Sequence, residues 1–202
     1  MNRLLIVTAL MSEAVPLIDF YRMQKQPKRK HYHLYTAASE HATLRLELLV
    51  GGLGAENMRK GLAAYFNHCN SYDKNIYLNI GIAGALHVPV GSLLWAGSVA
   101  ETCISIPQGV RQTAVYAVHS LPVASTQYLP GVLFDMEAES WLKSISENSH
   151  PFAPTELFCA KVVSDNQRQH GHKIDKIWVT DCVRQNIVEL DESINKLIKS
   201  LK

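Results

Sequence analysis

Three carboxylates stand where chemistry is to be expected in a protein built from strands and helices. Glu13 comes just after an apolar run at residues 3–9, Asp165 follows an apolar run at residues 157–163, and Glu137 lies in the segment FDMEAES. Carboxylates at such places can transfer protons or accept hydrogen bonds from hydroxyl groups. Taken alone, Glu13 has a simpler interpretation, because an acidic residue in the first turn of a helix also complements the helix dipole.

Glycines mark two further strand ends. The turn at residues 51–54 (GGLG) follows an alternating run at residues 43–50, and Gly81 and Gly84 follow the apolar run at residues 76–80. Glycine lets a backbone approach a ligand closely, but it equally lets a helix pack tightly on a strand. The first turn has neither GxGxxG spacing nor a P-loop lysine, so a phosphate cradle is not established by it.

The elements that must position these residues alternate between strand and helix. Short runs that are apolar throughout indicate strands buried on both faces, and residues 58–69 carry apolar side chains at helical spacing. Residues 136–145 and a long amphipathic stretch from Val183 to Leu201 also predict helices, whereas residues 174–181 fit either strand or helix. This alternation predicts an α/β sheet covered by helices, with ligands bound beyond the carboxyl ends of the strands.

The composition and charge of the chain argue against several classes of protein. The chain has 202 residues, 47% of them hydrophobic and 19% charged, which predicts one globular domain over residues 1–202 rather than a disordered chain. The net charge of +2 gives no electrostatic reason to expect nucleic acid or a membrane as partner. The basic segment at residues 24–33 is expected to be a solvated loop or hairpin. Four widely spaced cysteines and the lack of a cleavable leader favour a cytoplasmic protein without a bound metal.

The order and local sequence of these segments resemble the nucleoside phosphorylase superfamily, in particular its 5′-methylthioadenosine/S-adenosylhomocysteine nucleosidase branch. IVTALMSEAVPLI is similar to that branch's opening strand and glutamate, GGLGAENM to its SGIGKVNA turn, and LNIGIAGAL to its NTGSAGGL. FDMEAES is similar to VEMEAAA and KVVSDN to RAISD; these two, in the right order, are the specific part. The resemblance implies a single domain with a central mixed, twisted, partly barrel-like sheet flanked by helices.

The resemblance also implies a role for each matching residue. Glu13 aligns with the glutamate that activates the attacking water, and Asp165 with the aspartate that protonates the leaving purine. Ser164 aligns with the serine that positions this aspartate, while Met136 and Glu137 align with the pair that holds the ribose. The remaining expected substrate-binding residues are the aromatic base stacker and the glycine-segment backbone: Tyr128, Gly81, Ala83 and Gly84.

The chemistry of these residues agrees with hydrolysis of an N-ribosidic bond. Cleavage creates positive charge on the sugar and negative charge on the base, so one carboxylic acid and one water-activating carboxylate meet both needs, as in inverting glycosidases. We expect burial to keep Asp165 protonated. No cofactor is implied, and the partners expected are a purine-type nucleoside and a second copy of the chain.

Two alternatives stay open at this stage. A phosphorylase would cleave a similar nucleoside with phosphate, but Ile82 stands where the superfamily has a serine or threonine, and an aliphatic side chain cannot bind phosphate. A non-catalytic nucleoside-binding module is favoured by a shortened stretch at residues 101–123 and opposed by the intact set of Glu13, Glu137 and Asp165.

Overall fold

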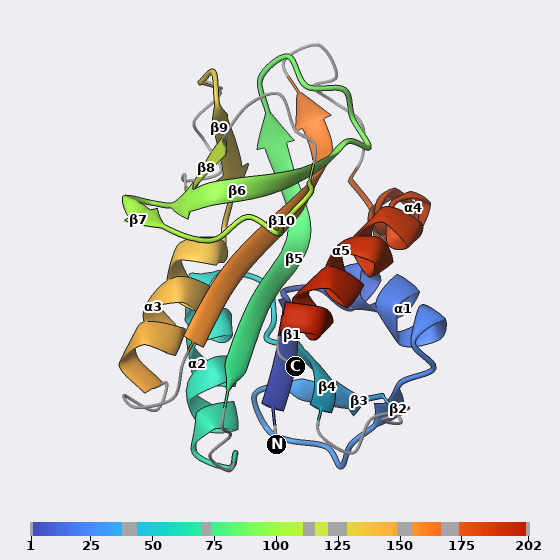
Figure 1. Cartoon of the computed structure of the whole chain (residues 1–202), viewed down its shortest axis with the longest axis vertical. Helices are drawn as coiled ribbons and strands as arrows, with labels where there is room; N and C mark the ends of the chain where they lie inside the picture. Colours follow the sequence, from blue (N-terminus) through green and yellow to red (C-terminus); the bar gives the residue numbers. More distant parts are fainter. Residues whose placement is uncertain are drawn as a thin grey trace.

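The computed structural model describes residues 2–37, 44–69, 74–110, 116–120, 129–148, 155–166 and 174–200, and shows an α/β architecture (Figure 1). The strands are β1 (Asn2–Thr8), β2 (Gln24–Lys25), β3 (His33–Thr36), β4 (Leu44–Val50), β5 (Asn75–Ala85), β6 (Leu93–Val99), β7 (Thr102–Cys103), β8 (Tyr116–Ser120), β9 (Val132–Asp135) and β10 (Thr155–Asn166). The helices are α1 (Met11–Phe20), α2 (Ala55–Phe66), α3 (Ala138–Asn148), α4 (Lys176–Gln185) and α5 (Ile187–Ser200).

All these strands belong to one mixed sheet. β1 lies parallel to both β4 and β5, and β10 lies parallel to β5. β10 also pairs with β6, and β6 returns to β5 through β8 and β9, so these five strands form a closed ring. The predicted mixed, partly barrel-like sheet is therefore confirmed, and β4, β3 and β2 extend it as an open edge.

Helices cover the sheet on two sides and give it two apolar cores (Figure 1). Successive side chains of a strand point to opposite faces, so β1 supplies both cores. Leu5 packs in the core that includes Trp141 of α3, and Leu4 in the core that includes Ile194 of α5. All four are fully buried, and burying an apolar side chain of this size stabilises the fold by about 1.5–3 kcal/mol. No helix in the described part of the chain is long and apolar enough to cross a membrane.

The residue at the capping position of α1 makes no side-chain hydrogen bond to the first turn of the helix. The helix begins at Met11, with Leu10 at the capping position, so Ser12 already lies in the first turn. Pro16 lacks the N–H that would bond to the carbonyl of Ser12 four residues earlier. The Thr180 hydroxyl of α4 lies 3.0 Å from that carbonyl oxygen and 2.9 Å from the carbonyl oxygen of Lys176, so its one proton is shared between them. When it is donated to Ser12 it replaces the missing bond and ties α4 to the turn that carries Glu13.

Thr180→Val should lower the free energy of unfolding by about 1 kcal/mol, because the Ser12 carbonyl loses its donor while the shape of the side chain is kept. Thr180→Ser retains the hydroxyl and is the matched control. Urea unfolding of the three proteins measures the effect. Equal midpoints for the Val and Ser variants would show that the bond contributes nothing.

The helical end of the chain differs from its prediction. The apolar spacing from Val183 onward predicted one helix, but the structure has two, with a break at Asn186. The Asn186 amide donates to the carbonyl oxygens of Gly91 and Cys182, both at 2.9 Å, and so fixes the chain where α4 ends. The undecided residues 174–181 enter α4, and the basic segment forms the expected hairpin, in which β2 pairs with β3.

Candidate active site

Glu13 occupies the point where β1 passes into α1, and backbone groups hold both of its oxygens. Oε2 accepts the N–H groups of Ala9 and Leu10 at 2.9 and 2.8 Å, and Oε1 accepts the N–H of Ile82 at 3.1 Å. The side chain is buried, and this burial raises its pKa above the ordinary value, against the effect of those N–H groups and of Lys161. Glu13 is therefore a fixed carboxylate with a raised affinity for a proton, which suits a general base.

Lys161 is a buried cation in the middle of β10. Its Nζ lies 2.5 Å from Asp135 Oδ2 and donates to Asn79 Oδ1 at 2.6 Å. Burial by itself lowers the pKa of Lys161, but the negative charge of Asp135 outweighs it, and the pKa stands above its ordinary value. Lys161 is thus charged throughout the physiological range, and it balances part of the negative charge gathered at this end of the sheet.

Gly81 lies close to both Glu13 and Lys161. Lys161 is its register partner in β10. A Cβ atom placed on Gly81 would stand 3.0 Å from Glu13 Oε1 and 3.2 Å from Lys161 Nζ. Any side chain here would push apart the carboxylate and the ammonium group. The glycine predicted to let the backbone approach a ligand thus first allows these two charged groups to approach the strand.

Asp135 and Glu137 come from the turn between β9 and α3. Asp135 Oδ1 accepts the N–H groups of Glu137 and Ala138 at 2.8 and 2.5 Å, so it caps the helix, and α3 starts at Ala138 rather than at the expected Met136. Glu137 Oε1 accepts the N–H of Gly54 at 2.5 Å. Burial, together with the charge of Asp135, raises the pKa of Glu137 to about 7.

Ser164 and Asp165 lie at the end of β10, where an irregularity in pairing places Asp165 opposite Gly84. The buried Ser164 hydroxyl donates to Asp165 Oδ1 at 2.6 Å, so it contacts the carboxyl that it was predicted to position. Asp165 itself is half-buried, so the full burial expected of it is not observed. Gly84 is two residues beyond Ile82 in β5, a rise of about 7 Å, so Asp165 is one short step from the Glu13 contact.

The other expected site residues are placed less directly. Met136 is 40% exposed next to Glu137, so its thioether is free to contact a ligand. The side chain of Ala83 belongs to the apolar core on the α2–α3 face, so this residue offers a ligand its backbone alone. Tyr128 lies outside the described residues. Among the residues that are described, no group of three or more His, Cys, Asp or Glu side chains is placed to hold a metal ion.

Two site residues were missed from the sequence. Lys161 interrupts the apolar run at residues 157–163, and Asn79 interrupts the one at residues 76–80. Lys and Asn are seldom fully buried without partners, so a polar residue inside a run predicted to be buried was the available signal. Both are buried, and they bond to each other.

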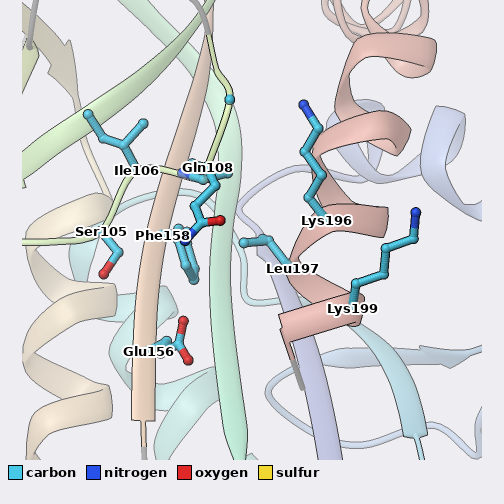
Figure 2. Close-up of a pocket in the computed structure, with 10 residues that line it drawn as sticks. Ser105, Ile106, Gln108, Glu156, Phe158, Lys196, Leu197 and Lys199 are labelled. Carbon is cyan, nitrogen blue, oxygen red and sulfur yellow. The ribbon is translucent and has the colours of Figure 1, made fainter. Parts of the chain in front are cut away.

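A sizeable cavity in the described residues lies away from these carboxylates. It has about 790 Å³ and lies between α5, the loop at residues 105–109 and the first part of β10 (Figure 2). Glu156 on its wall is nine residues before Asp165, so some 30 Å of strand separates it from the carboxylates. Glu156 already pairs with Lys74 at 3.1 Å. Chemistry therefore identifies the site better than cavity size does.

Solved structures share this fold over nearly the whole chain. A 5′-methylthioadenosine nucleosidase from Arabidopsis thaliana has a TM-score of 0.70 at 16% identity, over 96% of this chain and 95% of that one. An MTAN from Chlamydia trachomatis bound to adenine has 0.69 at 20% identity, over 94% and 97%. A futalosine hydrolase mutant from Helicobacter pylori has 0.66 at 11% identity, over 97% and 100%.

These neighbours are members of the nucleoside phosphorylase and hydrolase superfamily, and the chain has their fold. The resemblance inferred from the motifs is thereby confirmed at the level of the fold. No protein-family model matches the sequence. No curated protein matches it either.

Proposed function

We propose that the protein hydrolyses the N-ribosidic bond of a purine-type nucleoside, similar to methylthioadenosine or S-adenosylhomocysteine, and releases the free base. The observation that carries this proposal is Glu13, a buried carboxylate held by three N–H groups beside the cation Lys161. The nucleosidases and futalosine hydrolase of the same fold support it.

The reaction follows from two proton transfers. The bond between C1′ and the base nitrogen breaks, its electron pair moves to the base, and Asp165 gives the base a proton. A water molecule gives a proton to Glu13, and its oxygen bonds to C1′, which had become electron-poor. The products are a neutral base and a free sugar, and each proton transfer contributes about 10²- to 10⁴-fold in rate.

The sugar is assigned to the turn before α3. An ionised Glu137 accepts hydrogen bonds from both ribose hydroxyls more strongly than a neutral group does. Gly54 already donates to Oε1 of Glu137 and fixes its direction, and the exposed Met136 packs on the sugar. Glu137 then positions the sugar, and Glu13 activates the water that attacks it.

Water rather than phosphate is favoured as the nucleophile by Ile82. Of the residues of β5, Ile82 is the one that is not buried, and it contacts Glu13 through its backbone N–H. Its side chain offers no hydrogen bond to a phosphate oxygen at the position next to the catalytic carboxylate.

From the resemblance to the nucleosidases we also propose that the protein is a cytoplasmic homodimer, and light scattering on the purified protein tests the dimer.

The pH dependence should reflect Glu137. Below about pH 7 this carboxyl is protonated in the free enzyme, so kcat/KM should fall as the pH is lowered from 7, with a slope that approaches tenfold per pH unit. A profile of kcat/KM from pH 5 to 9 measures it. A profile that stays flat down to pH 5 would contradict the assignment of an ionised Glu137 to the ribose.

The same group should show itself in stability. A carboxyl with a raised pKa binds more protons in the folded than in the unfolded protein between about pH 4.5 and pH 7, so stability falls as pH rises through this range. Glu137→Gln removes the cost of ionising this buried group, so the variant should gain about 1–2 kcal/mol over the wild type at pH 8, and the gain should vanish near pH 4. Urea unfolding at the two pH values measures it, and a gain that grows toward acid pH would have the wrong sign.

Base release measured by liquid chromatography tests the proposed function. Methylthioadenosine, S-adenosylhomocysteine, adenosine and inosine are incubated with the protein without phosphate, alongside Asp165→Asn. Release by the wild type that is lost in the variant supports the proposal. If every nucleoside stays intact but binds, the protein is a binding module and the proposal fails.

A further inference from the structure

A second cavity adjoins the proposed active site and is strongly basic. It has a volume of about 420 Å³, and we call it the basic pocket; the basic side chains on its walls are those of Lys28, Arg29, Lys30, His31, His33 and Lys60. Asp and Glu are absent from its walls in the part of the chain that the structure describes. Lys60 is already paired with Glu56 on the surface of α2, which leaves the charges of Lys28, Arg29 and Lys30 for a ligand. Arg29 and Lys30 are the two nearest in the chain to His31, whose carbonyl oxygen packs against α2 at Gly61.

Strand register and one close helix contact hold the basic segment in place. His33 opens β3 opposite Val50, the last residue of β4, so residues 28–31 lie beside the turn at Gly51. A Cβ atom on Gly61 of α2 would stand 3.1 Å from the carbonyl oxygens of both Gly51 and His31. The glycine thus lets α2 pack against the backbone of His31 and the turn together. This contact fixes the path of the basic segment along the cavity, while the side chains of Arg29 and Lys30 stay exposed to solvent.

The basic pocket touches both loops that hold the catalytic carboxylates. Leu10, on its wall, donates its N–H to Glu13. Leu53, also on its wall, directly precedes Gly54, whose N–H binds Glu137. The cavity therefore includes a residue that anchors Glu13, and it begins one residue away from the residue that anchors Glu137.

Strand order indicates which part of a nucleoside points there. The strands β10, β5, β1, β4 and β3 lie in this order across the sheet (Figure 1). Asp165 lies near the end of β10, and the basic pocket is lined by residues at the ends of β1 and β4. A nucleoside with its base at Asp165 and its ribose hydroxyls at Glu137 spans β5 between them. Its 5′ carbon, at the opposite end of the sugar from the base, is then directed toward the basic pocket.

We propose that the basic pocket binds an anionic group, a carboxylate or a phosphate, on the 5′ side of the nucleoside, with Arg29 and Lys30 as its ligands. This inference rests on the proposed function, whose site it extends. Arg pairs with both kinds of anion through two parallel hydrogen bonds, and Lys contributes a point charge. The Nδ1 atom of His33 is buried at this wall without a hydrogen-bond partner among the described residues, so one further polar atom there is unsatisfied.

The test compares matched nucleosides that differ in charge. Adenosine is paired with adenosine 5′-monophosphate, and methylthioadenosine with its analogue carrying a 2-carboxyethyl group on sulfur. The anionic member of at least one pair should have a kcat/KM at least about 10-fold higher, and raising the salt from 50 to 500 mM should reduce that ratio. A preference confined to the phosphate pair identifies a nucleotide, and one confined to the carboxylate pair identifies an acid-bearing nucleoside.

Variants assign the effect to the basic pocket. Arg29→Gln combined with Lys30→Gln should lower the ratio of anionic to neutral kcat/KM by about 10- to 100-fold, since two charge-assisted contacts are lost. Lys25→Gln is the matched control, because Lys25 belongs to the same basic segment but is exposed in β2, outside the basic pocket. Equal ratios in the two variants would overturn the assignment.

A binding measurement separates this inference from the proposed function. Equilibrium dialysis of the same pairs on the Glu13→Gln, Asp165→Asn double variant, in which both proton transfers are removed, gives dissociation constants with little turnover. Tighter binding of an anionic member, lost in the Arg29 and Lys30 variant, supports the basic pocket even if no base is released. Hydrolysis of neutral nucleosides with no preference for an anion would overturn the inference and leave the proposed function standing.

Discussion

Glu13→Gln should lower kcat by about 10³-fold while leaving KM within a few-fold, because the amide cannot accept a proton from water. The carboxylate uses both oxygens as acceptors, toward Ala9 and Leu10 on one side and Ile82 on the other. An amide must turn its NH₂ group toward one of these donors, so the fixed geometry is also weakened. Steady-state rates of base release measure the effect.

Glu56→Gln is the matched control for that change. Glu56 lies in the first turn of α2 as Glu13 lies in the first turn of α1, but it is exposed and pairs only with Lys60 at the surface. Its replacement should leave kcat on methylthioadenosine unchanged. A Glu13→Gln protein that unfolds like the wild type and retains more than a third of its kcat would remove Glu13 from the mechanism.

Lys161→Met should destabilise the protein by about 3–5 kcal/mol, since it leaves Asp135 as a buried charge without its counter-ion. Asp135 cannot turn away to water, because its other oxygen caps α3 through Glu137 and Ala138. Base release should fall as well, since Glu13 loses the adjacent cation. Urea unfolding at pH 8 measures the first effect.

A second substitution distinguishes lost charge balance from lost packing. Asp135→Asn keeps an oxygen to cap α3 and removes the charge, so the double variant with Lys161→Met should recover part of the lost stability without recovering activity. The half-exposed pair of Lys74 and Glu156 serves as the control, and Lys74→Met should cost less than about 1 kcal/mol. A double variant less stable than Lys161→Met alone would show that charge balance is not what Lys161 supplies.

The fold was predictable because short apolar runs indicate buried strands, and apolar residues at helical spacing indicate helices with one apolar face. The sequence could not show that α4 ends at Asn186, because the apolar spacing continues from α4 into α5. Val183 and Ile187 are four residues apart, which suits one helix as well as two. The break depends on the bond from Asn186 to Gly91, 95 residues earlier, and a local pattern carries no information about such a contact.

In the site too, local patterns were predictive and long-range contacts were not. Glu13 and Glu137 were expected at strand ends, and the structure places them just after β1 and β9. Gly81 was expected at the end of a strand as well, but β5 continues to Ala85, so this glycine lies inside the strand. Lys161 was missed because its partners Asp135 and Asn79 are 26 and 82 residues away, and only the folded register places them together. The expected burial of Asp165 failed for a related reason, since the pairing irregularity before it was not visible in the sequence.

The central claim is that water attacks the sugar, and the products of one reaction test it most directly. The protein is incubated with methylthioadenosine in phosphate buffer, and the free base, reducing sugar and sugar 1-phosphate are measured together. The structure predicts one free reducing sugar for each base released and no consumption of phosphate. Sugar 1-phosphate formed in proportion to base would contradict this account and show that phosphate is the nucleophile despite Ile82.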